Sequence, residues 1–296
     1  MDISVIVVNW NAGSVLEECL RTITRELETV SGECLVVDNG SQADEVQRLQ
    51  QQFPQITLLA NSQNLGFARA VNQGIRRSQG RYLMLLNPDA ALTHGSLRHL
   101  MSRLDIHADI GIIGPRIMNE DGTIQGSART FPGVFTAFFG RTSFLTRHFP
   151  NNPLSGGQIQ ALNAQIEGQQ VVDWVSGACM LIRRQALEEV GELDEQFFLY
   201  WEDADLCWRI HKQGWDVVYD PQVYVTHVVG ASSKRAFFRS LIAFHQSAYR
   251  LYRKHVTRST WHPLNALAAL GLSVRVLGLL LGRGVQELGR TQKKEM

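Results

Sequence analysis

The sequence lacks any cysteine arrangement that would hold a metal or build a disulfide framework. Its four cysteines are scattered along 296 residues, and no two of them form a CxxC pair. Zinc ribbons need such pairs, and disulfide scaffolds are small, cysteine-dense chains. We therefore expect buried, reduced thiols. The cysteines are Cys19, Cys34, Cys179 and Cys207.

The N-terminus lacks the features of an export signal. Its opening MDISVIVVNW has no basic stretch, and the apolar run is only long enough for a strand. Internal repeats and low-complexity tracts are also missing. With 44% hydrophobic residues the chain can fill a sizeable globular core, and we expect it in the cytosol.

Acidic residues are absent between Pro221 and Gln286, a stretch that holds nine Lys and Arg residues. Residues 1–220 carry 17 basic and 26 acidic residues, so the two parts have opposite charge. This split predicts that the C-terminal part meets an anionic surface. Since no recognised nucleic-acid motif is present, we expect a membrane surface and no nucleic acid.

Two segments of this basic part predict helices that lie on a membrane. Residues 236–258 interleave aromatic side chains with Arg and Lys, which is typical of interfacial helices. Residues 264–282 form an apolar stretch of 19 residues, and Arg275 near its centre disfavours a span. A membrane span and a contact between soluble copies are the alternatives.

The first 115 residues alternate short apolar runs with helical patterns, which predicts an α/β fold. The runs are rich in Val, Ile and Leu, as buried parallel strands require. We expect a doubly wound, mostly parallel sheet with ligands beyond the carboxyl ends of its strands. The expected strands are residues 3–8, 33–38, 56–60, 81–86 and 110–114, and the expected helices are residues 14–27, 67–78, 95–104 and one opening at Ser41.

Ser14 with Glu17 has the spacing of a capping box, and Ser41 with Asp44 predicts a similar cap for the next helix. After an irregular connection at 126–170, VVDWVSGACMLIRRQAL predicts a strand that enters a helix. A helix over 203–212 and two strands, DVVYDP and VYVTHVVG, complete the pattern. We expect one domain over 1–232 and a basic, amphipathic helical extension over 233–296.

Two turns at predicted strand ends suit a nucleotide. Asp38 in VVDNGS can accept hydrogen bonds from a base or a ribose. In NSQNLGFARAVNQG, Asn64 and Gly66 form a tight turn at a helix N-terminus that suits a phosphate, and Arg69 can add a charge-assisted contact. The alternatives are an Asx-turn at Asp38 and an ordinary capped surface helix.

LLNPDAAL places one carboxylate just beyond a buried strand. Pro88 forces Asn87 into an extended conformation, so Asn87 and Asp89 lie along the sheet edge. Asp89 offers a hard oxygen ligand for Mg²⁺ or Mn²⁺, and His227 in THVVGAS completes the site if the fold brings it close. A turn or an N-cap at Asp89 is the alternative.

WEDADLCWR carries the densest group of carboxylates, Glu202, Asp203 and Asp205, at a predicted helix start. The helix dipole stabilises charge there, so a cap explains one or two of them. The preceding aromatic run FFLYW lowers the local dielectric and raises a carboxylate's pKa toward that of a general base. A base flanked by aromatics fits a sugar site, and a capped amphipathic helix is the alternative.

Taken in order, these motifs resemble family 2 glycosyltransferases, which have the GT-A fold. LNPDA together with WEDADLCWR looks most like the rhamnosyltransferase branch of bacterial surface polysaccharide synthesis. The resemblance covers residues 3–232 and rests on VIVVNWN, VVDNGS, NLGFARAVNQG, LLNPDA, SGACMLIRR, WEDADLCWR and THVVGAS.

The resemblance implies roles for individual residues. Asp203 matches the family's catalytic base, with Glu202 beside it. Asn87 replaces the first aspartate of the Asp-x-Asp metal motif, so this position keeps a carbonyl oxygen but loses a negative charge. The candidate nucleotide-binding residues are Asn9, Asp38, Asn64, Gly66 and Arg69, the metal ligands Asp89, His227 and Asn87, and the sugar and acceptor pocket Trp174, Gly177 and Trp201.

The resemblance also implies an inverting, metal-dependent glycosyltransferase that uses Mg²⁺ or Mn²⁺. The expected donor is dTDP-L-rhamnose, and the expected acceptor is a lipid-linked glycan such as polyprenyl-pyrophosphate GlcNAc. We expect a peripheral or monotopic protein at the cytoplasmic face of the inner membrane, with a homo-oligomer left open. The alternatives are a UDP-hexose donor and a catalytically weak sugar-nucleotide binding protein. A nucleotidyltransferase needs a basic, Gly-rich first loop, and VVNWNAGSVLEE has no Lys or Arg.

Overall fold

The computed structural model describes residues 1–132, 167–228, 237–257 and 262–292. The described residues form two compact units, one made of residues 1–131 and 167–228 and one made of Pro132 and the helices from Phe237 onward. The elements are β1 Ile3–Asn9, α1 Ser14–Leu27, β2 Gly32–Asp38, α2 Ala43–Gln52, β3 Thr57–Ala60, α3 Phe67–Arg77, β4 Tyr82–Leu86, β5 Ala90–Leu92, α4 Ser96–Ile106, β6 Ile110–Met118, β7 Ile124–Gln125, β8 Ala128–Arg129, β9 Gln170–Val171, β10 Trp174–Val175, β11 Cys179–Arg183, α8 Arg184–Val190, α9 Glu202–Lys212, β12 Asp216–His227, α10 Phe237–Tyr252, the π-helical turn η2 Arg253–Thr257 and α11 Pro263–Gln292.

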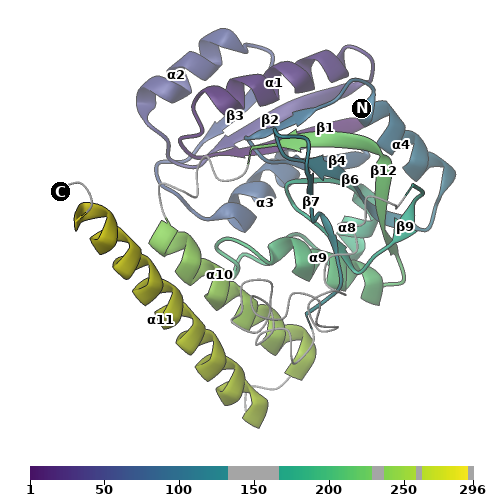
Figure 1. Ribbon diagram of the computed structural model, residues 1–296. Coiled ribbons are helices and arrows are strands. Elements are labelled where there is room, and N and C mark those ends of the chain that lie inside the picture. Colours follow the sequence, from purple (N-terminus) through teal and green to yellow (C-terminus); the bar gives the residue numbers. More distant parts are fainter. Residues whose placement is uncertain (133–166, 229–236, 258–261, 293–296) are drawn as a thin grey trace. The chain divides into compact units, whose positions relative to one another are not determined.

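A ten-stranded sheet forms the centre of the first unit (Figure 1). Its main path runs β3-β2-β1-β4-β11-β6-β12-β5, and the first four strands are parallel. The predicted α/β fold with a mostly parallel sheet is confirmed. β11 is antiparallel to both of its neighbours, so its first residue, Cys179, pairs with the last residue of β4, Leu86. The turn before β11 therefore lies at the carboxyl end of β4.

Helices cover both faces of this sheet, as a doubly wound fold requires. Successive side chains of a strand point to opposite faces. Val5 and Val7 of β1 accordingly join the core cluster that contains Leu16 of α1. Ile6 points the other way, to α3, where a Cβ on Gly74 would lie 2.6 Å from the Ile6 side chain. Glycine at this position permits the close approach of α3 to β1.

Both predicted capping boxes are wrong. Gly13, with φ 66°, occupies the N-cap of α1, and Ser14 is already helical. Gln42 occupies the N-cap of α2, and neither cap residue makes a side-chain hydrogen bond. The Ser41 hydroxyl instead accepts from the Asn11 N–H at 2.9 Å. A tertiary contact between two strand-end turns thus replaces the local cap.

The last part of the sheet also differs from expectation. Instead of two strands, β12 is one strand with a register shift between Asp220 and Tyr224. Most of the irregular connection, residues 133–166, and the predicted domain boundary at 232 lie outside the described residues. The cysteines are buried, as expected, and burial raises the pKa of the Cys34 thiol to about 12.

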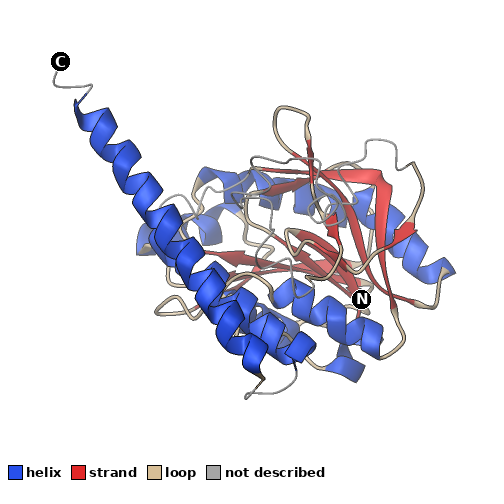
Figure 2. Cartoon of the chain, turned by 60° about the horizontal axis from the view of Figure 1, so that its bottom comes forward, coloured by secondary structure: helices blue, strands red, loops and turns tan. Residues whose placement is uncertain are grey.

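The second unit consists of α10, η2 and α11, and Figure 2 shows α11 as one continuous helix. The segments expected to be helical, 236–258 and 264–282, are therefore helical within the described ranges. Among the helices that the structure describes, none is both long and apolar enough to cross a membrane.

Candidate functional site

The turns after β1 and β2 are joined through Asn9 and Asp38, which are register partners at the strand ends. The Asn9 side-chain amide donates to the Asp38 carboxylate at 2.8 Å. The N–H groups of Gly40 and Ser41 donate to the other Asp38 oxygen at 3.2 and 2.9 Å. Asp38 is 1% exposed, so in this conformation its carboxylate holds the turn. Nucleotide contacts by Asn9 and Asp38 stay predictions.

Asn39, which the sequence reasoning missed, extends this network to the second predicted turn. Its buried amide donates to the Asn64 side chain at 3.1 Å and to the Gly66 carbonyl at 3.2 Å, and it accepts from the Leu65 N–H at 3.0 Å. The signal available in the sequence was its place directly after Asp38 at a strand end.

Gly66 lies against the aromatic loop that precedes α9. The Phe67 N–H donates to the Phe198 carbonyl at 2.7 Å. Gly66 has φ 91°, and a Cβ there would lie 2.8 Å from Phe198. Only glycine combines this backbone conformation with such a close approach. The turn predicted to bind the nucleotide is therefore in direct contact with the loop that leads to Asp203, the predicted base.

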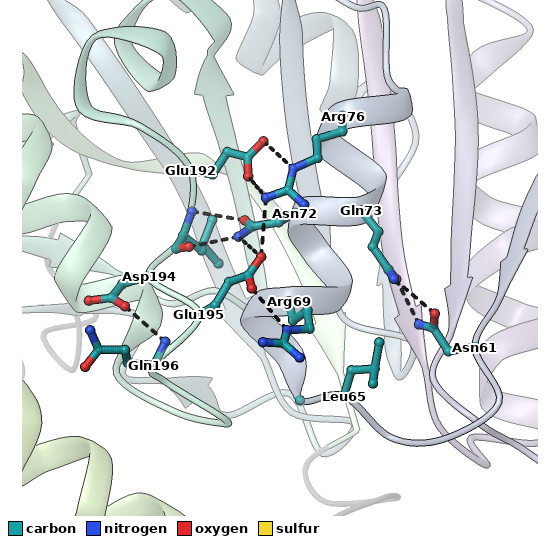
Figure 3. A network of polar contacts seen from close by, with 12 residues as sticks. Asn61, Leu65, Arg69, Asn72, Gln73, Arg76, Glu192, Asp194, Glu195 and Gln196 are labelled. Atoms are coloured by element: carbon teal, nitrogen blue, oxygen red, sulfur yellow. Dashed lines mark hydrogen bonds and ion pairs between the residues drawn. The ribbon is translucent and has the colours of Figure 1, made fainter.

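Arg69 takes part in a polar network between α3 and the loop after α8 (Figure 3). Its Nε donates to Glu195 at 3.0 Å, while Arg76 binds Glu192 at 2.6 Å. Asn72 lies between them and is 1% exposed. Arg69 is thus held by a carboxylate in this conformation, and its contact with a donor phosphate stays a prediction.

Asp89 and His227 meet at the edge of the sheet because β5 pairs with β12, with His227 opposite Ala90. The Asp89 Oδ1 lies 3.1 Å from His227 Nε2. The side-chain amide nitrogen of Asn87, Nδ2, lies 3.3 Å from the same nitrogen. The structure therefore brings the three predicted metal ligands together in one place, which we call the cation corner.

Gln125 determines which nitrogen of His227 faces the cation corner. The Gln125 amide nitrogen donates to the His227 carbonyl and to Asn119, both at 2.8 Å, which fixes the amide orientation. Its oxygen then faces His227 Nδ1 at 3.0 Å, so Nδ1 must carry a hydrogen. Nε2 is left facing Asp89.

This arrangement fits a bound cation. A neutral His227 presents the Nε2 lone pair to a carboxylate oxygen, and two acceptors at 3.1 Å need a proton or a metal ion between them. A ligating histidine usually donates its other N–H to an oxygen, as here to Gln125. Among the described residues, no three His, Cys, Asp or Glu side chains are arranged to hold a metal ion, so the side-chain oxygen of Asn87 would supply the third ligand after its amide rotates.

One short turn, Ser176–Ala178, links the cation corner to Asp203. The Asn87 N–H donates to the Ala178 carbonyl at 2.9 Å. The N–H of the preceding residue, Gly177, donates to Asp203 Oδ2 at 2.9 Å. A Cβ on Gly177 would lie 3.2 Å from that of Asp203, so the small residue allows this approach. Gly177, predicted to line the sugar and acceptor pocket, is therefore adjacent to Asp203, the predicted base.

Asp203 and Glu202 open α9, with Glu202 buried and Asp203 half-buried. Burial raises the pKa of Asp203, and hydrogen bonds from the Gly177 and Ala204 N–H groups, with the charge of Arg129, oppose the rise. Burial and the neighbouring Asp203 charge raise the pKa of Glu202 well above its usual value. Asp205 instead pairs with Arg209 at 2.9 Å. Of the three carboxylates, Asp203 is the one hydrogen-bonded to the turn at the cation corner.

Two tryptophans and an arginine stand beside Asp203. The rings of Trp174 and Trp201 have centroids 5.9 Å apart, and the Arg129 guanidinium lies 4.8 Å from the Trp174 ring centre. Trp201, with φ 70°, is held in a left-handed conformation directly before α9. We call Arg129, Trp174 and Trp201 the aromatic corner. Arg129 was missed because it lies in the irregular stretch that carried no motif.

Comparisons with known proteins relate the chain as a whole to a protein family. The sequence profile described as "Glycosyltransferase like family 2" matches residues 1–243. The N-acetylglucosaminyl-diphospho-decaprenol L-rhamnosyltransferase of Mycobacterium tuberculosis is 32% identical over 257 residues, covering 83% of this chain and 82% of the relative. The rhamnosyltransferase WbbL of Escherichia coli is 27% identical over 198 residues, covering 63% and 67%.

Among solved structures, the mannosyltransferase PcManGT from Pyrobaculum calidifontis, in complex with GDP-Man and Mn²⁺, has a similar fold. Its TM-score is 0.58 at 18% identity, with 97% of this chain and 80% of that chain covered. At this identity the likeness concerns the fold alone.

Proposed function

The chain belongs to glycosyltransferase family 2, and from that premise we propose that it transfers L-rhamnose from dTDP-L-rhamnose to a lipid-linked glycan, with inversion. The observation that carries the proposal is the short turn that joins Asp203 to the cation corner. A base and a site for diphosphate charge must lie close together in such a transfer. A relative that is 32% identical is named as a GlcNAc-diphospho-decaprenol L-rhamnosyltransferase, which is the reason for proposing a rhamnosyl group and a lipid-linked acceptor, whereas the dTDP nucleotide is our own assignment.

In the proposed reaction, Asp203 accepts the proton of an acceptor hydroxyl as that oxygen attacks the anomeric carbon of the donor sugar. The bond from the anomeric carbon to the diphosphate breaks on the opposite face. The nucleoside diphosphate leaves with the electron pair, and the centre inverts. A single displacement needs only one base, and we assign that role to Asp203. Glu202, at 6% exposed, stays beneath the surface beside it.

Asp89, His227 and Asn87 would hold Mg²⁺ or Mn²⁺ at the cation corner. When bound there, the ion supplies Lewis-acid stabilisation of the charge that builds on the leaving diphosphate. The chain's own contribution is to hold these side chains ready: the β5–β12 pairing positions Asp89 beside His227, and Gln125 orients the ring.

The second unit carries an exposed apolar helix face, as a protein that reaches a membrane-bound acceptor would need. Four apolar side chains spaced along one face of α11 are 50–62% exposed. They are Leu267, Leu270, Val274 and Leu277. Together with the absence of acidic residues between Pro221 and Gln286, this face supports peripheral binding to an anionic membrane, which we place at the cytoplasmic face of the inner membrane.

Flotation of the full chain with vesicles tests the membrane proposal. Binding to anionic vesicles should exceed binding to phosphatidylcholine vesicles and should fall with salt. The variant Leu270→Glu, Val274→Glu should bind less. Equal flotation of both proteins would exclude this face as the lipid contact.

A donor panel tests the transfer itself. Purified protein is incubated with dTDP-L-rhamnose or UDP-hexoses and a synthetic GlcNAc-diphosphate lipid, and nucleotide release is measured with and without EDTA. The proposal expects rhamnose transfer that EDTA abolishes. Release from a UDP-hexose alone would contradict the donor assignment, and release from no donor would favour a sugar-nucleotide binding protein.

A further inference from the structure

The aromatic corner combines two kinds of group that bind different parts of a charged sugar. Arg129 is the register partner of Trp174 in the pair formed by β8 and β10. The Trp174 indole N–H donates to the Thr130 carbonyl at 3.1 Å, which fixes its ring beside Trp201. Indole faces pack on the apolar face of a sugar, and a guanidinium forms paired hydrogen bonds with phosphate oxygens.

The corner lies on the Asp203 side of the linking turn. The charge of Arg129 opposes the rise that burial causes in the pKa of the Asp203 carboxyl, so the two groups are within electrostatic reach. The Arg129 Nε donates to the Gly126 carbonyl at 2.8 Å, which orients the guanidinium. Under the proposed function, this is the side on which the acceptor hydroxyl must lie.

The same chain segment connects Arg129 to the cation corner. Gln125, which orients His227, precedes Arg129 by four residues in the sequence. Four extended residues span at most about 14 Å. One short segment therefore serves both the site proposed for the donor diphosphate and a second cationic group on the acceptor side.

We propose that Arg129 binds the diphosphate of the acceptor, with Trp174 and Trp201 against the acceptor sugar. The proposal rests on the proposed function and names what that function leaves open, the group by which the acceptor is recognised. A lipid-linked sugar carries its diphosphate on the anomeric carbon, one ring away from the hydroxyl that reacts. Arg129 and Asp203 would thus hold two ends of the same sugar.

Binding of two synthetic acceptors to the full chain tests this proposal. One probe is GlcNAc joined to an alkyl chain through a diphosphate, and the other is the neutral alkyl glycoside of GlcNAc. By calorimetry the wild-type protein should bind the diphosphate probe about tenfold or more tightly, the scale of a charge-assisted pair. In Arg129→Gln this preference should largely disappear, and Arg129→Lys should keep part of it.

The ratio of the two affinities separates recognition from other effects of the substitution. A change in Asp203 ionisation or in folding alters both probes alike, whereas loss of a phosphate contact alters only one. Arg48→Gln, an exposed arginine of α2, is the matched control and should keep the wild-type ratio. A wild type without preference, or an Arg129→Gln variant with the wild-type ratio, would overturn the proposal.

Kinetics distinguish the acceptor diphosphate from that of the donor. If Arg129 serves the acceptor, Arg129→Gln raises KM for the diphosphate acceptor more than KM for the donor. A rise confined to donor KM would overturn the inference. Because the calorimetric ratio needs no turnover, failure of rhamnose transfer in the donor panel refutes the proposed function separately.

Discussion

The buried side chain of Asn72 binds both backbone polar groups of Leu193. Its amide nitrogen donates to the Leu193 carbonyl at 2.9 Å, and its oxygen accepts from the Leu193 N–H at 3.0 Å. Its nitrogen also lies 3.2 Å from Glu195 (Figure 3). One side chain of α3 thereby pairs with the loop that leads to α9, much as a neighbouring strand would.

Asn72→Ala should destabilise the protein. It leaves two backbone groups of Leu193 without partners in a buried place, and each such group costs about 1–3 kcal/mol. Urea unfolding of wild type and variant measures the loss. Gln73→Ala, which removes a partly exposed amide pair with Asn61 on the same helix, is the control and should cost less. Equal losses in both variants would contradict the role given to Asn72.

Asp203→Asn should fold but lose transfer by about 10²–10⁴, the usual contribution of a general base. The amide keeps the shape of the side chain and one oxygen for the Gly177 N–H. Steady-state transfer rates test the expectation, with Asp44→Asn on exposed α2 as the control. Wild-type turnover in Asp203→Asn would remove the residue from this role.

The acid limb of the pH profile should lie above the ordinary aspartate pKa of about 3.9. Burial raises the pKa of Asp203, and a base works only when deprotonated, so kcat/KM should fall as the pH drops through that raised value. A pH–rate profile measures it. A limb at the ordinary aspartate value, or none, would argue against Asp203 as the base.

Glu202→Gln should stabilise the protein more at pH 8 than at pH 4. Burial raises the pKa of Glu202 in the folded state, so that state binds the proton more tightly than the unfolded chain. Stability from this group is therefore lost as the pH rises from about 4.3 through the folded pKa, at about 1.4 kcal/mol per unit of pKa difference. Glutamine carries no titrating proton and removes this loss.

Thermal unfolding at the two pH values measures this difference. Glu188→Gln, on the exposed side of α8, is the control and should show little change with pH. A Glu202→Gln variant whose stability follows that of the wild type at both pH values would contradict the expectation.

Gln125→Leu should weaken Mn²⁺ binding about 10–100-fold, the usual effect of removing the partner of a ligating histidine. Leucine cannot accept the Nδ1 hydrogen of His227, so the ring loses its fixed orientation. Calorimetric titration with Mn²⁺ gives the affinity. A dissociation constant equal to that of the wild type would mean that His227 holds no metal.

Asn87→Asp provides the opposite test at the same corner. It adds a carboxylate beside Asp89 and His227, so Mn²⁺ should bind more tightly. If Asn87→Asp leaves the Mn²⁺ affinity unchanged and EDTA leaves the activity unchanged, Asp89 is a turn residue, as LLNPDAAL alone also allows.

Much of the fold followed from local patterns. The apolar runs at β1, β2, β3 and β4 and the helices between them were predicted within a few residues, because buried parallel strands leave a strong signal. The helix caps were not predicted correctly, because the Ser41 hydroxyl binds the neighbouring turn instead of capping its own helix. The unbroken β12 was also missed, since its irregularity near Asp220 resembles a strand end.

The sequence by itself determined which chemical groups are available at the ends of strands and at a helix start: Asp38, Asp89, His227 and Asp203 were all identifiable from their motifs. The tertiary structure decided which of them meet. Asn87 and His227 are 140 residues apart, and they approach only because β5 pairs with β12. Asp203 reaches Gly177 because β11 enters the sheet in the opposite direction to β4. Such distances depend on strand order and direction, which local residue patterns do not encode.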